Sequence, residues 1–247
     1  MKNDIFVVTA AYGNDKVLTL GGQQSLLPII AQSGAAGVEI RRELLTKTDL
    51  KHLPALRQEI TGYPLRCFYS APEALFNPDG SLNSLAPRLF TEANQLGAER
   101  LKLSLGHFST AANLTALATL LAGQPVALTV ENDQTECGRL APLTAFFQRV
   151  SATGLPITMT FDIGNWHWVG QEALDAAGRL AAHVGYIYVK TAIHASAGWR
   201  AIPPDVEDEH WRQLLAVLPD NVPRGIEFPL VGEDLTAVTR RFVALLQ

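Results

Sequence analysis

Short runs rich in β-branched and aromatic residues recur eight times along the chain, and a stretch with helical periodicity separates each run from the next. The runs are IFVVTA from residue 5, GVEIR from 37, PLRCFYS from 64, ERLKLSL from 99, PVALTVE from 125, PITMTFD from 156, YIYVK from 186 and GIEF from 225. Strands that alternate with helices form parallel sheets, because each helix returns the chain to the same edge. Eight units at a spacing of roughly 30 residues predict a (β/α)8 TIM barrel.

The stretches between the runs contain residues that favour the starts and ends of helices. Ser109 and Gly123 are expected to cap a helix over 109–123, and similar patterns cover 81–97, 138–154, 171–185 and 233–247. No linker or low-complexity segment interrupts the alternation, so we expect one domain over residues 1–247. A doubly wound open sheet is the alternative, although no glycine-rich dinucleotide loop follows the first strand.

Composition narrows the function classes. The net charge of −4 and the scattered charged residues predict no nucleic-acid partner. Two cysteines, Cys67 and Cys137, make neither a disulfide framework nor a zinc spacing, which favours a reducing compartment. We see no signal peptide and no apolar run of membrane length, so we expect a cytoplasmic protein with no membrane association.

Alternation within the strands places ionisable side chains on the inner face. In PITMTFD, the apolar side chains at 157, 159 and 161 share one face and leave Asp162 on the other. The same rule leaves four acids and three bases inside the barrel: Glu39, Glu131, Asp162, Glu227, Arg41, Lys102 and Lys190. Buried charges are a poor source of stability, because desolvation commonly offsets their attraction. Their position at the carboxyl ends of strands therefore favours an active site over structural salt bridges.

Several segments resemble one family. Three segments, LTVEN, FDIGN and GIEFP from residues 128, 161 and 225, carry a glutamate, an aspartate and a glutamate at the ends of the fifth, sixth and eighth strands. GVEIRREL and VEDEHWRQLLAVL match further segments. At these residues the chain resembles the xylose isomerase-like barrel superfamily, the sugar phosphate isomerase/epimerase and endonuclease IV-type group. The likeness covers nearly the whole length. The family's His-x-Lys-Asp motif reads Tyr188-Val189-Lys190-Thr191 here.

The resemblance implies that Glu131, Asp162 and Glu227 bind a divalent metal (Mg, Mn or Zn). Glu131 and Glu227 would then form the acid/base pair that moves a proton through an enediolate intermediate. Tyr188 stands where the family has a metal-binding histidine, and tyrosine is a rare ligand. Alternatively, the ammonium groups of Lys190 and Lys102 supply the positive charge and Tyr188 donates a proton.

Further residues are predicted to bind substrate. They are Glu39, Arg41, Lys102, His107, Asn165, Trp166, His194 and Arg200, with the last two in the loop after the seventh strand. The segment WHW, residues 166–168, follows Asp162 closely and would line the sugar site, contact a partner subunit or pack on a helix face, which leaves a homo-oligomer open.

The predicted function is that of an isomerase or epimerase acting on a small sugar, sugar phosphate or keto-polyol. The alternatives are a lyase, dehydratase or decarboxylase acting on an oxidised sugar, or a non-catalytic sugar-binding barrel. A DNA-repair endonuclease is disfavoured, because the histidines of its trinuclear zinc site are absent at the sixth and seventh strands.

Overall fold

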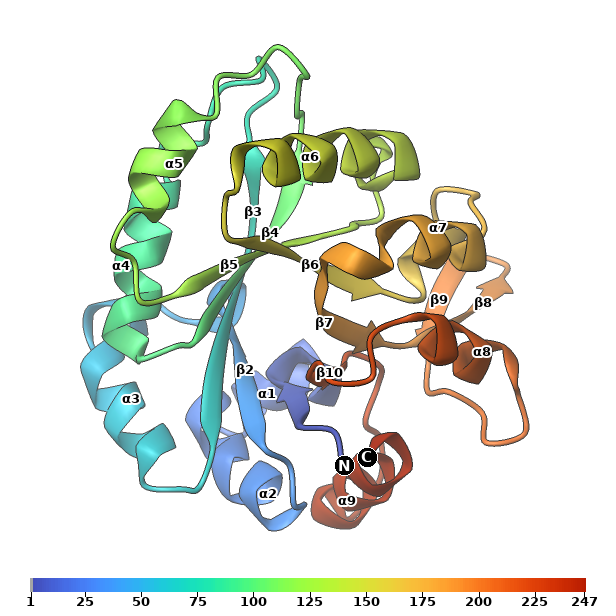
Figure 1. The fold of residues 1–247 in the computed structure, drawn as a ribbon. Helices are drawn as coiled ribbons and strands as arrows, with labels where there is room; N and C mark the ends of the chain where they lie inside the picture. The colour runs from blue at the N-terminus through green and yellow to red at the C-terminus, as the bar shows by residue number, and fades with distance from the viewer. Residues whose placement is uncertain (1) are drawn as a thin grey trace.

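The first strand of the sheet pairs with the last, which closes the sheet into a barrel (Figure 1). The computed structural model describes residues 2–247. The strand order around the barrel is β1-β10-β7-β6-β5-β4-β3-β2, and every neighbouring pair is parallel. The predicted (β/α)8 barrel is therefore confirmed, and the open doubly wound sheet is excluded.

The barrel strands follow the predicted runs closely. They are β1 (Ile5–Val8), β2 (Gly37–Arg41), β3 (Arg66–Phe76), β4 (Arg100–Gly106), β5 (Ala127–Glu131), β6 (Ile157–Asp162), β7 (Val184–Val189) and β10 (Arg224–Ile226). The strand β3 extends further than predicted, and its pairing with β4 shifts register between Ser70 and Ala74. Such an irregularity bends the strand, and beyond it Ala74 and Phe76 still pair with Ser104 and Gly106 of β4.

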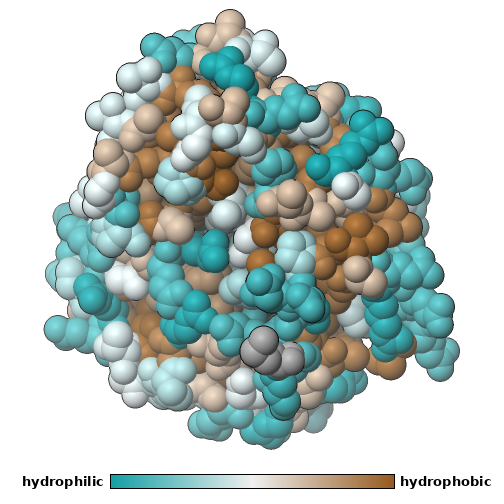
Figure 2. All heavy atoms as spheres, viewed as in Figure 1, coloured by the Kyte–Doolittle hydropathy of each residue, from teal (hydrophilic) through white to brown (hydrophobic). Residues whose placement is uncertain are grey.

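Helices surround the barrel. They are α1 (Asn14–Thr19), α2 (Leu27–Gln32), α3 (Leu53–Thr61), α4 (Ala86–Leu96), α5 (Thr115–Leu121), α6 (Leu140–Thr153), α7 (Ala173–Leu180), α8 (His210–Val217) and α9 (Leu235–Leu246). In Figure 2, hydrophilic side chains cover much of the visible periphery and apolar ones show between the elements. No helix within residues 2–247 is long and apolar enough to cross a membrane.

Two helix starts differ from their predictions, because α4 begins at Ala86 and not near residue 81, and α5 also begins late. The helix α5 begins at Thr115, not near Ser109, and the Asn113 side chain accepts a hydrogen bond from the Thr115 N–H at 2.9 Å. Ser109 instead accepts from the N–H of Ala111 at 3.2 Å, in a turn before the helix. Asparagine and serine both stabilise turns in this way, so the sequence offered two competing starts.

A hairpin occupies the segment that follows β7. The strands β8 (Thr191–Ala195) and β9 (Gly198–Ile202) pair in antiparallel fashion and form a separate two-stranded sheet. Sequence reasoning described this segment only as a long loop. The hairpin projects from the barrel beside α7 and α8 (Figure 1).

The barrel has two apolar regions. Ile157, Met159 and Phe161 point outward, as predicted, into the large core beneath the helices. A separate cluster fills the amino end of the interior, where the rings of Phe6 and Phe68 stack with centroids 3.8 Å apart. The amino end is therefore closed by aromatic rings, which the sequence analysis did not predict.

The stacked rings of Phe6 and Phe68 form an aromatic floor, and Tyr186 packs on it. Its ring meets Phe68 edge-on, with centroids 5.0 Å apart. A Cβ atom at Gly225 would lie 2.4 Å from the Tyr186 hydroxyl, and one at Gly37 would lie 2.2 Å from the Phe6 ring. Both positions require glycine because the large rings occupy the space that a side chain would need.

Phe68→Ala should destabilise the fold. The side chain is buried and packs on rings from two other strands, so its removal leaves a cavity that the barrel walls cannot collapse into. We expect the free energy of unfolding in urea to fall by about 3–5 kcal/mol. Tyr63→Ala, at a partly exposed position, is the control and should change it far less. A loss below about 1 kcal/mol for Phe68→Ala would contradict this account of the floor.

Candidate active site

Four ionisable side chains meet at the carboxyl end of the barrel. Glu131 and Asp162 are the last residues of β5 and β6, whereas Lys190 and Glu227 follow directly after β7 and β10. The chain folds this way because successive side chains of a strand point to opposite faces, and the neighbouring apolar side chains are drawn into the outer core. The carboxyl end is where barrel enzymes place their active sites.

Lys190 bridges two of the carboxylates. Its ammonium lies 2.8 Å from Asp162 Oδ2 and 2.5 Å from Glu227 Oε2. The Lys190 side chain is only 4% exposed, so it is charged in a largely desolvated place. Burial lowers the pKa of Lys190, but Asp162 and Glu227 outweigh burial and raise it above its ordinary value. Lys190 therefore holds a positive charge at the centre of the site.

The two carboxylates beside Lys190 differ in their ionisation. Burial raises the pKa of Asp162 to about 7, against the opposing effect of Lys190. Burial also raises the pKa of Glu227, but Lys190 and Arg41 outweigh it and hold this pKa below its ordinary value. Carboxylates whose environments separate their pKa values are suited to different roles in proton transfer.

Backbone groups fix Asp162 in place. Its Oδ1 accepts hydrogen bonds from the N–H groups of Gly164 at 2.8 Å and Asn165 at 3.0 Å. A Cβ atom at Gly164 would lie 2.8 Å from Lys190 Cγ, so the glycine leaves room for the lysine stem. The DIGN sequence thus forms a tight turn that presents one carboxylate oxygen to Lys190.

Glu131 has a different cation as its partner. The Lys102 ammonium donates to Glu131 Oε2, and Asn165 Nδ2 lies 3.3 Å from Glu131 Oε1. Asn132 links this part of the site to β6, because it exchanges hydrogen bonds with the backbone N–H and C=O of Asp162 at 2.8 and 3.0 Å. Asn132 was not predicted, although it directly follows Glu131 in the LTVEN segment.

Arg41 lies at the rim beside Glu227. Its Nη1 is 3.6 Å from Glu227 Oε1, and its Nη2 is 2.6 Å from Glu43 Oε1. The Gln23 side chain binds the backbone N–H and C=O of Arg41 at 2.8 and 2.9 Å, which holds the end of β2. The Glu227 side chain keeps 19% exposure here, so solvent reaches the catalytic candidate from this side.

Tyr188 points away from these carboxylates. Its hydroxyl donates to the Glu39 carboxylate, and the Tyr186 hydroxyl donates to the other Glu39 oxygen at 2.9 Å. Both tyrosines and Glu39 are fully buried. Burial raises the pKa of Glu39 and raises the pKa of Tyr188 well above its ordinary value. These three residues, the tyrosine-glutamate layer, separate the charged mouth from the aromatic floor.

Comparison with known proteins identifies the fold. A xylose isomerase domain containing protein from Salmonella typhimurium LT2 has a TM-score of 0.71 and 14% identity, over 100% of this chain and 98% of that one. The fold is that of a xylose isomerase-like TIM barrel. No family model and no curated protein sequence matches the chain.

Two further similar structures carry reaction names. A D-allulose 3-epimerase from Methylomonas sp. has a TM-score of 0.66 and 11% identity, over 100% of this chain and 98% of that one. The probable 3-DHS dehydratase AsbF from Bacillus anthracis has a TM-score of 0.65 and 13% identity, with the same coverage. The neighbours therefore include isomerising and eliminating enzymes.

The remaining predicted substrate-binding residues are dispersed. Trp166 is fully buried against Phe161, with ring centroids 5.4 Å apart, so it faces the outer core. His107 is exposed just beyond β4, and His194 and Arg200 lie on the β8–β9 hairpin. The structure brings none of these four to the carboxylates.

Trp168 lies closer to the site than Trp166. The Lys190 ammonium is 5.8 Å from the centroid of the Trp168 ring, within the range of a cation–π contact. Trp199 on β9 packs against Trp168 and stacks on His167, with centroids 6.4 and 4.8 Å away. The segment WHW after Asp162 was noticed in the sequence, but its 3-10 turn (Asn165–His167) decides which tryptophan faces the mouth.

The family resemblance predicted a divalent metal, so we ask whether the side chains that would bind it are free to do so. The similar barrel IolI, with a TM-score of 0.67 and 13% identity over 98% of this chain and 96% of that one, has a bound zinc atom. Here, the Lys190 ammonium already bridges Asp162 and Glu227, and Lys102 binds Glu131. Tyr188 is engaged with Glu39, and residues 2–247 contain no cluster of three metal-ligating side chains. These residues do not fit a divalent metal.

Glu39→Gln should change how stability depends on pH. Because burial raises the pKa of Glu39 above 4.5, its contribution to stability is present below pH 4.5 and is lost as pH rises through the folded-state pKa. Glutamine has no such proton to lose. We expect urea unfolding to show the wild type losing stability relative to Glu39→Gln as pH rises, by about 1.4 kcal/mol per unit of raised pKa.

The matched control for this pH series is Phe68→Ala, which removes a buried group that does not titrate. Its stability should run parallel to that of the wild type across the same pH range. A constant difference between the wild type and Glu39→Gln would contradict the burial argument for Glu39.

Proposed function

We propose that this protein is an isomerase or epimerase that moves a proton at a carbon beside a carbonyl group of a small carbohydrate. The observation that carries the proposal is the pairing of Glu131 and Glu227 with separate ammonium groups at the carboxyl mouth of the barrel. The epimerases among the structural neighbours support this kind of reaction.

In the proposed reaction, Glu227 acts as the base, because its lowered pKa keeps it ionised at neutral pH. It takes the proton from the carbon, the C–H electrons form the C=C bond of the enediolate, and the carbonyl oxygen becomes anionic. Once Glu227 is protonated, its attraction for Lys190 weakens, and the Lys190 ammonium is free to stabilise the new oxyanion. A preorganised cation in a desolvated site is effective in this role.

The Lys102 ammonium, which donates to Glu131, would pass a proton through Glu131 to the opposite face of the enediolate, and the proton held by Glu227 would then leave to solvent while Lys102 regains one from solvent. Lys102 and Asn165 hold the Glu131 carboxylate from two directions, so its position is fixed. Arg41, at the rim, would bind a substrate oxygen, and Trp168 would pack against the sugar ring. Tyr188 and Glu39 would act as positioning residues beneath Lys102, whose ammonium lies 5.5 Å from the Tyr188 ring centroid.

A lyase is the second candidate, and the dehydratase neighbour favours it. The same proton abstraction gives elimination when a hydroxyl group on the next carbon leaves as water. The two candidates differ in their products, because a dehydratase yields an unsaturated compound and an epimerase yields an isomer of unchanged mass.

The test uses a panel of ketoses and keto acids in deuterated water. Deuterium at a carbon beside the carbonyl reports proton abstraction, and mass spectrometry reports any loss of water. A complete lack of exchange and elimination across the panel would mean that the ion pairs are structural, and it would favour the non-catalytic barrel.

We further propose that the protein is cytoplasmic and acts as one domain over residues 1–247.

Glu131→Gln and Glu227→Gln should each slow exchange by roughly 10²- to 10⁴-fold, because general acid/base groups contribute about this much. The unfolding transition should remain cooperative in both variants. The control is Glu136→Gln, which removes an exposed carboxylate on the surface and should leave the rate unchanged. A rate close to that of the wild type in either Glu131→Gln or Glu227→Gln would reject its role.

Lys190→Met should abolish exchange, because the charge that stabilises the enediolate is lost and two carboxylates then repel each other. Dialysis against a chelator should leave the wild-type rate unchanged, and elemental analysis of untreated protein should find no stoichiometric divalent metal. Lys47→Met, at an exposed position, is the control. A chelator-sensitive rate accompanied by one bound metal per chain would overturn the lysine-based mechanism.

The family's histidine can be restored to test the same point. Tyr188→His combined with Lys190→Met removes the bridging ammonium and the phenol, and places a shorter imidazole at the β7 position that pairs with Asp162. We expect this double variant to bind zinc more tightly than the wild type does, measured by titration of the metal alone. Equal zinc affinity in both proteins would contradict the view that Lys190 and Tyr188 keep metal out.

A further inference from the structure

A second concave site lies on the flank of the barrel, away from the carboxylates. It is a pocket of about 380 Å³ between the β8–β9 hairpin and α9. The residues that matter to its chemistry are Arg200, Ile202, Val231, Val238, Arg241 and Phe242. None of the ionisable residues at the barrel mouth lines it. The pocket therefore needs an explanation of its own.

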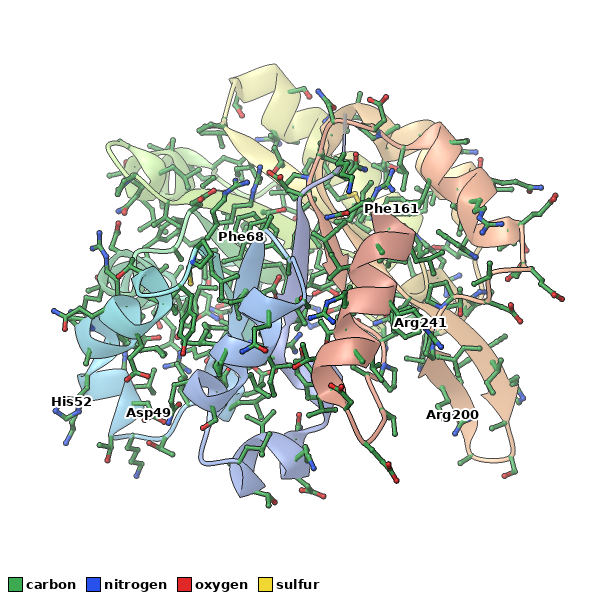
Figure 3. All side chains as sticks on the ribbon, turned by 90° about the horizontal axis from the view of Figure 1, so that it is seen from below. Asp49, His52, Phe68, Phe161, Arg200 and Arg241 are labelled. Atoms are coloured by element: carbon green, nitrogen blue, oxygen red, sulfur yellow. The ribbon has the colours of Figure 1, made fainter. Side chains whose placement is uncertain are left out.

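Two guanidinium groups in this pocket lack a partner. Of the 14 arginines in the chain, ten contact a carboxylate or form a hydrogen bond within residues 2–247. The four described arginines without such a partner are Arg57, Arg200, Arg212 and Arg241. Two of these four line the same pocket. Figure 3 shows Arg241 on α9 and Arg200 on the hairpin, on the same side of the molecule.

The remaining wall of the pocket is apolar. Val238 and Phe242 come from one face of α9, and Ile202 comes from the end of β9. Val231 is 81% exposed, which is unusual for a side chain of its kind. An apolar surface of this type gains free energy when a ligand covers it.

Arg241 is already partly oriented. Its guanidinium carbon lies 4.5 Å from the centroid of the Phe242 ring, in a cation–π contact. Such a contact holds the plane of the guanidinium while its N–H groups remain free to donate. Paired N–H donors match the two oxygens of a carboxylate or phosphate group.

We propose that this pocket binds a small organic anion whose charged oxygens lie between Arg200 and Arg241 and whose apolar body packs on Val238 and Phe242. The chemistry shared by the candidate ligands is an anionic oxygen group on an apolar body, as in an alkyl carboxylate or an alkyl phosphate. The proposal does not rest on the catalytic role of the barrel mouth.

The test is calorimetric titration of the full chain with octanoate and, separately, with hexyl phosphate. We expect saturable binding of at least one of them at one site per chain, and the tighter of the two identifies the preferred anionic group. Inorganic phosphate lacks the apolar body, and 1-octanol lacks the anionic group. We expect both to bind at least about tenfold more weakly than the preferred anion.

Matched variants locate the binding. Arg200→Gln and Arg241→Gln should each weaken binding by about tenfold or more, since each removes charge-assisted hydrogen bonds. Arg212→Gln removes another arginine without a partner, outside the pocket, and should leave the affinity unchanged. All three side chains are exposed, so the variants should fold, which circular dichroism will verify.

Three outcomes would overturn the proposal. The first is an absence of saturable binding for both organic anions. The second is unchanged affinity in the Arg200→Gln, Arg241→Gln double variant. The third is equal affinity for inorganic phosphate, which would remove the role of the apolar wall. Because the readout is binding alone, none of these results depends on whether the barrel is catalytic.

Discussion

The structure depends on the neutralisation of charge inside a barrel. Carboxylates and ammonium groups at the mouth are taken from water, which costs several kcal/mol for each ion unless close partners compensate. Lys190 between Asp162 and Glu227, and Lys102 on Glu131, supply that compensation. The arrangement stabilises the fold little, but it holds two cations against the two glutamates that we propose to transfer protons. When a carboxylate in such a site gains a proton, it loses its charge, and the ammonium paired with it is released.

The order of the layers inside the barrel, from the amino end to the carboxyl end, follows from the need to neutralise buried charge. Aromatic rings at the amino end exclude water from below, and the tyrosine-glutamate layer above them carries a single buried carboxylate with two phenol donors. Polarity therefore rises from the floor to the mouth. Lys102 crosses this gradient, because it lies two residues before Ser104, the β4 residue that pairs with Glu131, and its long apolar stem still carries the ammonium to the Glu131 carboxylate.

Much of this architecture could be predicted from alternation within strands. The recurrence of eight strands separated by helices predicted the barrel, and alternation within strands placed Glu131, Asp162, Lys190 and Glu227 at one end, because strand parity and strand ends are local properties. The same rule, extended to the amino ends, would have placed Phe6 and Phe68 inside, since they share parity with Val8 and Ser70.

Other features could not be predicted because they depend on distances across the barrel. Tyr188 has the parity of a site residue, but its hydroxyl reaches Glu39 on the other side of the interior, 149 residues earlier in the chain. The choice between Trp166 and Trp168 depends on a single 3-10 turn. The partners of each carboxylate likewise depend on which lysine reaches it, and a sequence pattern carries no such information.

The β8–β9 hairpin has a consequence for how this protein can diverge. Its two strands pair only with each other, so they contribute nothing to the ladder that closes the barrel. Changes in its length or sequence leave that closure intact, whereas a change in any barrel strand alters the register of its neighbours. Because the hairpin starts directly after Lys190, new ligand preferences can arise there by mutation while the inherited scaffold keeps its stability.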